Sequence, residues 1–145
     1  MVFPDEIRSI ISAGGWSWNS VAQPYPETID HQNIARSTFG RCLRRENDHC
    51  HFLKENLCAI YEQRPRICRT YPFFLEDNKL KVSRCGGLGQ VISEQDATMI
   101  AYPLLQRQRA EEEEAQRVRQ VLQHTQFPSG ACVVIDREGV RVIDG

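Results

Sequence analysis

Four cysteines, Cys50, Cys58, Cys68 and Cys85, lie within one short segment that is rich in arginine. Thiolate sulfur is the form of cysteine that binds metals, and soft thiolates select zinc, copper(I) and iron–sulfur centres. Four thiolates are the number that closes a tetrahedral zinc site or holds a four-iron cluster. The sequence therefore indicates a metal centre more clearly than it indicates any reaction, and these four residues are its predicted ligands.

The spacing of the four cysteines does not identify the kind of metal site. The numbers of intervening residues are seven, nine and sixteen. Zinc fingers and knuckles contain pairs separated by two to four residues, and bacterial ferredoxins contain a C-x2-C-x2-C run. Neither pattern is present in this segment, so composition and spacing alone are also compatible with buried cysteines that bind nothing.

Further side chains near this segment could contribute to a metal site. Cys42 precedes Cys50 and is a candidate extra ligand. His49 and His51 flank Cys50, but adjacent residues of an extended chain point to opposite sides, which favours loop positions for both. Cys132 lies in an apolar run and is interpreted as a small buried hydrophobic residue.

The remaining pattern predicts an α+β fold: a small irregular cysteine-rich metal-binding domain with a kinked C-terminal helix and a terminal β-hairpin. The expected parts are a short helix over 4–12, a loop-rich stretch over 16–40, a metal-binding core over 41–89, a helix over 93–125 and a hairpin over 131–144. Pro103 is expected to kink or break the long helix, and no internal repeat is evident. The length of 145 residues predicts that 1–145 form a single domain.

The net charge of −1 does not indicate binding to nucleic acid. No apolar run is long enough for membrane insertion. No signal peptide is visible, so the expected location is cytoplasmic with reduced thiols. Charge is uneven, because residues 41–85 carry ten bases and six acids, a net charge of +4. Arg and Lys there would offset the charge of a thiolate centre. The acidic run 111–114 is interpreted as a solvated helix face, with a docking surface as the alternative.

The residues between the cysteines carry a motif. They read CHFL from Cys50, CAIYEQRPRICRTYPF from Cys58 and SRCGGLG around Cys85. This string resembles the YkgJ-type cysteine-cluster family of zinc- or iron-chelating domains, over about 45 residues from 41 to 89. Pro65 is expected to open a helical turn that carries Cys68. The aromatic run after Cys68 is expected to form an apolar wall, and Arg64 and Arg69 are candidates for charged hydrogen bonds. Members of that family carry a further cysteine cluster near the N-terminus, whereas no cysteine precedes Cys42 here.

The resemblance implies a metal-binding accessory or electron-transfer protein or subunit that works with a protein partner in a larger complex. A [4Fe-4S] cluster is favoured over zinc, because the wide spacings suit a cubane and short CxxC pairs are missing. Two alternatives remain open. One is a cluster-dependent enzyme that resembles relatives acting as flagellin lysine methylases, although no donor-binding domain is evident. The other is a structural zinc module without chemistry, and overall the sequence favours a protein that is not an enzyme.

Overall fold

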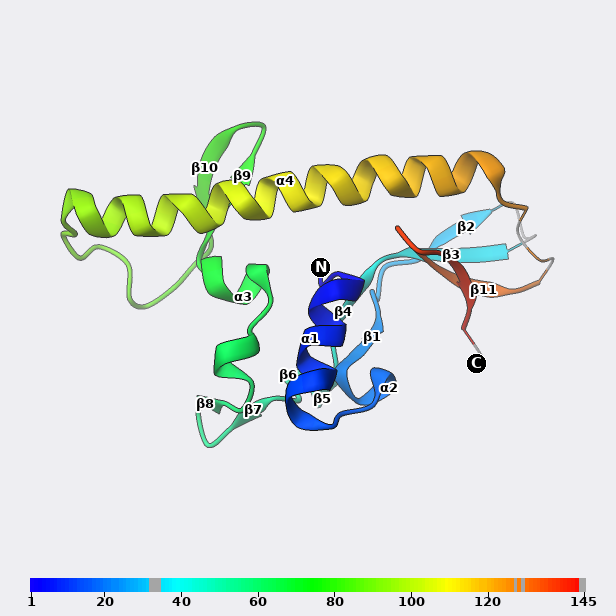
Figure 1. The fold of residues 1–145 in the computed structure, drawn as a ribbon, viewed down its shortest axis with the longest axis horizontal. Helices are drawn as coiled ribbons and strands as arrows, with labels where there is room; N and C mark the ends of the chain where they lie inside the picture. The colour runs from blue at the N-terminus through cyan, green and yellow to red at the C-terminus, as the bar shows by residue number, and fades with distance from the viewer. Residues whose placement is uncertain (32–34, 127, 129, 144–145) are drawn as a thin grey trace. The chain divides into compact units, whose positions relative to one another are not determined.

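The computed structural model describes residues 1–31, 35–126, 128 and 130–143. Contacts divide the chain into two compact units, the first formed by 1–63 with 114–145 and the second by 64–113 (Figure 1). The fold is mixed helix and strand, as predicted, with a long C-terminal helix and a terminal strand pair. The expected single domain over 1–145 stays a prediction.

The first unit contains most of the strands. Its elements are α1 (Pro4–Gly14), α2 (Trp18–Val21), β1 (Ala22–Pro24), β2 (Ile29–His31), β3 (Ala35–Phe39), β4 (Arg41–Leu43), β5 (Arg45–Glu46), β6 (His49–Cys50), β7 (Leu53–Lys54), β8 (Leu57–Cys58), the 3-10 helix η1 (Tyr61–Gln63), β11 (Cys132–Asp136) and β12 (Gly139–Val142). The stretch 16–40 was expected to be rich in loops with short elements, and in the described residues it contains the short helix α2 and the short strands β1, β2 and β3.

A sheet built from both ends of the chain forms the centre of the first unit. Its strand order is β12-β11-β3-β2, with β11 parallel to β3 and the other two pairings antiparallel (Figure 1). Val133, Val134 and Ile135 of β11 are fully buried, and so are Ile7 and Ile10 of α1. The three successive buried residues of β11 show that this strand is covered on both faces, which is typical of a strand with a parallel neighbour.

Helix α1 forms as its sequence predicted. Pro4 occupies its first turn, and the backbone N–H of Phe3 donates to the carboxylate of Glu6 at 2.9 Å. Gly15 takes the left-handed conformation that ends the helix, with φ of 67°. The isoleucines that share one helical face are the ones that reach the core, because positions three and four apart lie on the same side.

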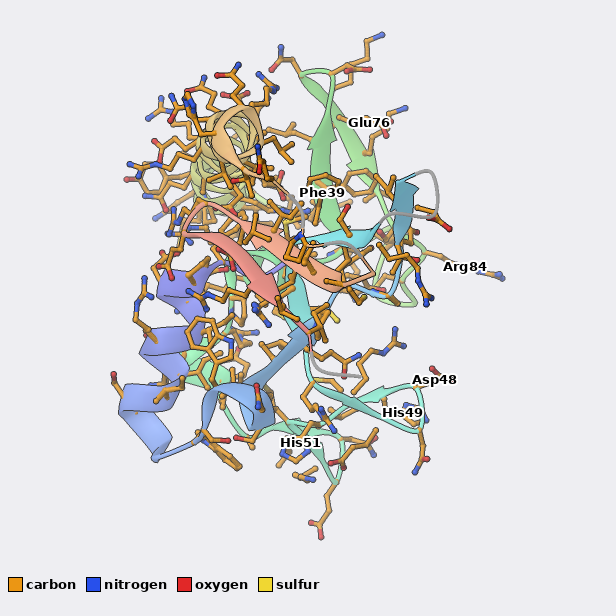
Figure 2. All side chains as sticks on the ribbon, turned by 90° about the vertical axis from the view of Figure 1, so that its right-hand side faces the viewer. Phe39, Asp48, His49, His51, Glu76 and Arg84 are labelled. Atoms are coloured by element: carbon orange, nitrogen blue, oxygen red, sulfur yellow. The ribbon has the colours of Figure 1, made fainter. Side chains whose placement is uncertain are left out.

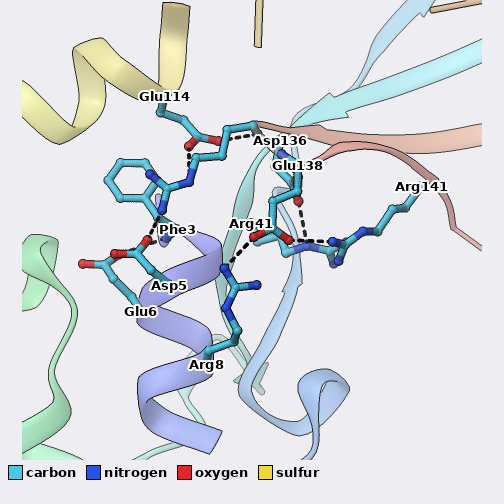
Figure 3. A network of polar contacts seen from close by, with 10 residues as sticks. Phe3, Asp5, Glu6, Arg8, Arg41, Glu114, Asp136, Glu138 and Arg141 are labelled. Atoms are coloured by element: carbon cyan, nitrogen blue, oxygen red, sulfur yellow. Dashed lines mark hydrogen bonds and ion pairs between the residues drawn. The ribbon is translucent and has the colours of Figure 1, made fainter. Parts of the chain in front are cut away.

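Charged side chains are also buried in the first unit. Glu114 accepts from the backbone N–H of Arg137 at 2.9 Å, and its second oxygen lies 3.5 Å from the Arg137 guanidinium, which also pairs with Asp5 (Figure 3). Only 4% of Glu114 is exposed. The interpretation of 111–114 as a solvated face was therefore wrong for Glu114, although Glu112 and Glu113 are exposed.

The second unit consists of α3 (Arg66–Thr70), a hairpin of β9 (Phe73–Glu76) with β10 (Lys79–Val82), and the first part of α4 (Glu94–His124), which ends in the first unit. Ser93 caps the start of α4, because the Asp96 backbone N–H donates to Ser93 Oγ at 3.1 Å. Pro103 lies inside α4 without breaking it. Pro103 has no N–H to donate to the carbonyl of Met99, four residues earlier in the helix.

The terminal hairpin is also confirmed. Strands β11 and β12 pair from Val133 with Val142 to Asp136 with Gly139, and Gly139 has a φ of 129°. Residue 144 of the predicted range lies outside the described residues. Within the part of the chain that the structure describes, no helix has the length and apolarity that crossing a membrane requires.

The burial of Glu114 predicts a pH dependence of folding. Burial raises the pKa of the Glu114 carboxyl above its ordinary value, although the bond from Arg137 partly opposes this. A carboxyl whose pKa is raised by folding contributes stability that is present below the unfolded pKa and is lost as pH rises through the folded pKa. We expect the free energy of unfolding of the natural chain, relative to Glu114→Gln, to fall as pH rises from acid toward neutral. Urea unfolding across that range measures this. A difference independent of pH would contradict it, and Glu113→Gln on the exposed face is the control.

Candidate metal centre

Two successive hairpins carry Cys50 and Cys58. Strand β5 pairs with β6 and β7 pairs with β8, and each cysteine ends the second strand of its hairpin. The backbone N–H after each cysteine donates to the carbonyl that precedes the first strand of its hairpin, His51 to Arg44 at 2.9 Å and Ala59 to Phe52 at 2.8 Å. The two hairpins therefore repeat one local structure with a step of eight residues, a repeat that the sequence analysis did not find.

The turns explain why the sequence forms these hairpins. Both central residues of each turn are left-handed, Asn47 (48°) with Asp48 (64°) and Glu55 (49°) with Asn56 (64°). This combination is the type I′ turn that matches the twist of two-residue hairpins, and Asn and Asp tolerate it best. The signal was present in the sequence as END and KEN, each followed two residues later by cysteine.

A buried apolar residue anchors each hairpin to the first unit. Phe52 and Ile60 each stand two positions after a cysteine, and both are buried. The Phe52 ring meets the Trp16 ring edge-on, with 5.4 Å between centroids, and His51 meets both rings in the same manner. Trp16 thus packs against the buried Phe52, and Cys50 and Cys58 are half-buried.

The remaining candidate ligands of the first unit do not join a cluster. His51 Nδ1 lies 2.8 Å from Glu46 Oε1, so its ring holds the base of the β5–β6 hairpin, while His49 lies near the tip (Figure 2). Cys42 lies in β4 opposite Gln23, and its burial raises the pKa of the thiol, which disfavours the thiolate. Cys132 is half-buried at the start of β11 rather than fully buried.

In the second unit, Cys68 lies in α3, the helix that begins directly after Pro65. The Cys68 N–H donates to the Pro65 carbonyl at 2.9 Å, so Pro65 opens the helical turn as predicted. The Arg69 side chain donates to the backbone carbonyl of Arg64 at 2.6 Å. That contact helps to hold the turn in place.

The segments that flank Cys68 and Cys85 are joined by hydrogen bonds. The Tyr71 hydroxyl donates to the Arg84 carbonyl at 2.9 Å, and the Ser83 N–H donates to the Pro72 carbonyl at 2.8 Å. The β9–β10 hairpin closes the loop between them through a third turn with two left-handed residues. The chain therefore returns after the hairpin to the segment that follows α3, which brings the neighbourhoods of both cysteines together.

An apolar cavity lies behind this hairpin. It has a volume of about 310 Å³ and is lined by Phe73, Leu75 and Leu80 of the hairpin and by Ile100 and Leu104 of α4, among others. The wall expected from the aromatic run is thus formed in part by Phe73. Tyr71 is instead exposed, and its hydroxyl is used in the bond to Arg84.

The four predicted ligands fall into two pairs, Cys50 with Cys58 in the first unit and Cys68 with Cys85 in the second. Among the described residues, no group of three or more His, Cys, Asp or Glu side chains stands close enough together to hold a metal ion. All six cysteines are free thiols, and the four predicted ligands are half-buried. A four-cysteine centre therefore stays a prediction, and the donor chemistry fits it because no sulfur is used in a disulfide.

Comparison with known protein families gives one match. Residues 17–86 match the model of the CxxCxxCC family, described as "Putative zinc- or iron-chelating domain". The matched range includes the cysteine hairpins, α3, the β9–β10 hairpin and Cys85, and it agrees with the resemblance seen in the motif. Comparison with curated proteins and with solved structures found no match.

The anchor beneath the cysteine hairpins can be tested by substitution. Phe52 is 1% exposed, and Phe52→Ala should lower the free energy of unfolding by about 3–5 kcal/mol because a large buried ring is removed. Leu57→Ala in the same pair of hairpins is the control, because its side chain is 74% exposed and should change stability by less than about 0.5 kcal/mol. Urea unfolding measures both, and equal effects would show that Phe52 does not anchor the hairpins.

Proposed function

We propose, from the premise that residues 17–86 belong to the CxxCxxCC family of zinc- or iron-chelating domains, that this protein binds its metal through Cys50, Cys58, Cys68 and Cys85. Each of these side chains is a half-buried free thiol. Partial burial lets a thiolate be shielded from water and still be reached by a metal during loading.

The pairing of the Cys68 and Cys85 neighbourhoods carries this proposal. Sixteen residues separate these cysteines in the sequence, a spacing that by itself gives no metal signature. The hydrogen bonds from Tyr71 to Arg84 and from Ser83 to Pro72 bring the segment after Cys68 close in space to the segment before Cys85. These bonds also fix the backbone on the side of each cysteine, so the flanking segments are ordered before a metal arrives.

The repeated hairpins support the contribution of Cys50 and Cys58. Each cysteine has the same position at the end of a two-residue strand, with a tight turn on one side and a buried anchor on the other. Such short elements restrict the backbone without filling the space around the sulfur. Cys50 and Cys58 are therefore held by the same local backbone structure.

We favour a [4Fe-4S] cluster over zinc for the bound group. The ligands come from separated short elements rather than from one compact knuckle, and a cubane spans more space than a single ion. The cluster, when bound, would supply one-electron chemistry. The chain's own contribution would be the four sulfurs, the nearby basic side chains and the apolar residues around them.

We further propose an accessory or electron-transfer role in the cytoplasm, with a protein partner. The free thiols suit a reducing compartment. No pair of a nucleophile and a base was recognised around the four cysteines, which favours a binding or redox role over an enzyme.

Substitution of single cysteines tests the ligand set. We expect Cys50→Ser, Cys58→Ser, Cys68→Ser and Cys85→Ser each to lose most of the metal that the natural chain holds after anaerobic purification. Cys132→Ser is the matched control, because it changes another half-buried free cysteine and should retain full metal. Elemental analysis and visible absorption give the readout, with about four iron atoms per chain for a cluster and about one zinc for the alternative.

The outcomes of this series are distinct. A brown protein that loses iron in all four variants supports the cluster. A colourless protein with one zinc, lost in the same variants, retains the ligand set and overturns the cluster. Metal content unchanged in the four variants, or no bound metal in the natural chain, contradicts the proposal. Cys42→Ser shows in the same assay whether the extra candidate takes part.

The bond between Tyr71 and Arg84 gives a second test. Tyr71→Phe removes the only hydroxyl in that contact, worth about 1 kcal/mol net, so metal affinity should fall about two- to fivefold. Competition against a chromogenic chelator measures this change. Tyr102→Phe, at an exposed position of α4, is the control and should leave affinity unchanged. Equal affinities for Tyr71→Phe and the natural chain would show that this bond does not order the ligand segments.

A further inference from the structure

A cavity in the first unit is lined by none of the four predicted ligands. The cavity has a volume of about 460 Å³ and is lined by residues of α2, β1, β4 and the terminal hairpin. Its charged lining residues are Arg41, Arg44 and Arg141, and none of the lining residues within the described part of the chain is acidic. The remainder of the wall is largely apolar, including Trp18, Val134 and Val142.

The three arginines come from two segments that are far apart in the sequence. Arg41 is in β4, Arg44 directly follows that strand, and Arg141 lies in β12 opposite Val134. The Trp18 ring lies between them in the lining, with the Arg41 guanidinium 5.6 Å and the Arg141 guanidinium 5.4 Å from the ring centroid. Stacking against an aromatic face holds a guanidinium in place and leaves its N–H edges available.

The surrounding carboxylates do not neutralise this group. Asp136 faces Arg41 at 3.7 Å, and Glu138 is shared by Arg8 at 2.5 Å and Arg141 at 2.8 Å (Figure 3). Four guanidinium groups, counting Arg44, thus stand against two carboxylates, an excess of two positive charges. The neighbouring carboxylates of Asp5 and Glu114 are bound to Arg137 and do not line the cavity.

Two N–H groups of lining residues are buried without a hydrogen-bond partner among the described residues. They are the indole N–H of Trp18 and the Nε–H of Arg41, whose side chain is 9% exposed. The separation of 3.7 Å between Arg41 and Asp136 is too long for a hydrogen bond. Burial lowers the pKa of the Arg41 guanidinium, and the nearby Arg141 charge acts in the same direction, against the opposing effect of Asp136. Asp136 Oδ2, the oxygen that faces Arg41 Nε, is also buried without a hydrogen bond among the described residues. Buried donors without partners are uncommon, and an oxyanion bound in the cavity would accept from them.

We propose that this cavity binds a small organic dianion, with its charged head on the three arginines and its apolar body against the wall formed by Val134 and Val142. A phosphate monoester and a dicarboxylate share this chemistry, because guanidinium forks recognise both. The excess of two positive charges matches two negative charges. The volume lies in the range of cavities for small molecules, which favours such a ligand over a macromolecule.

Titration calorimetry with the full chain tests the site. The probes are phenyl phosphate and phthalate, both dianionic near neutral pH with an aromatic body, and benzyl alcohol is the neutral control. We expect one of the dianions to bind at one per chain, with an affinity that falls as salt rises, and benzyl alcohol not to bind. The probe that binds identifies the head group as phosphate or carboxylate. Absence of binding by both dianions overturns the proposal.

Variants locate the binding. Arg44→Gln should weaken binding about tenfold or more through loss of a charged hydrogen bond, and Arg44 is exposed, so the fold should persist. Trp18→Phe keeps a ring but removes the unpaired N–H, and should weaken binding by a smaller factor. Arg119→Gln, on the exposed face of α4, makes the same charge change elsewhere and should have no effect. Equal weakening by Arg44→Gln and Arg119→Gln would indicate general charge attraction and overturn the site.

Metal content measured in the same preparations separates this proposal from the metal centre. Arg44→Gln should retain the metal of the natural chain while losing the dianion. The four Cys→Ser variants should retain the dianion, because no predicted ligand lines the cavity.

Discussion

The parallel pairing of β11 with β3 is the contact on which the first unit depends. Cys132 stands opposite Arg36 and Ile135 opposite Phe39, so a strand near the end of the chain completes a sheet begun near its start. The backbone N–H of Gly40 extends the pairing by donating to the Ile135 carbonyl at 2.8 Å. Gly40 has a φ of 69°, and a side chain there would meet Met1, so the chain can turn from β3 into β4 only at a residue like glycine. The cysteine hairpins follow directly from that turn.

In the cysteine segment, the course of the backbone is set by short turns rather than by long helices or strands. Three two-residue turns, each with both residues left-handed, define the β5–β6, β7–β8 and β9–β10 hairpins. Each makes a few backbone hydrogen bonds and buries little by itself. Stability comes from single anchors such as Phe52 and Ile60, because isolated two-stranded hairpins are marginal in water. This construction leaves the cysteine side chains half-buried.

The net charge of −1 hides local groups of positive and negative side chains in the folded chain. Arg137 is bound by Asp5 and Glu114, while Arg8 and Arg141 share Glu138 (Figure 3). Arg137 is therefore matched by two carboxylates, whereas Arg8 and Arg141 share one. In the sequence analysis, the basic residues of 41–85 were considered only as groups that offset the negative charge of a thiolate centre. The arginine-lined cavity also requires Arg141, which lies far outside that segment.

The sequence alone determined the local features of this protein. Pro4 and Gly15 bound α1, Ser93 caps α4, Gly139 permits the terminal hairpin, and the motif around Cys58 and Cys68 lies within the range 17–86 that the family model matches. These follow from backbone preferences and short-range spacing, which act over a few residues. The tertiary structure alone decided that Glu114 is buried, that the segments beside Cys68 and Cys85 meet and that three arginines face one cavity. Those outcomes depend on which distant segments pack together, and no local pattern encodes that choice because the energy that makes it is spread over the whole core.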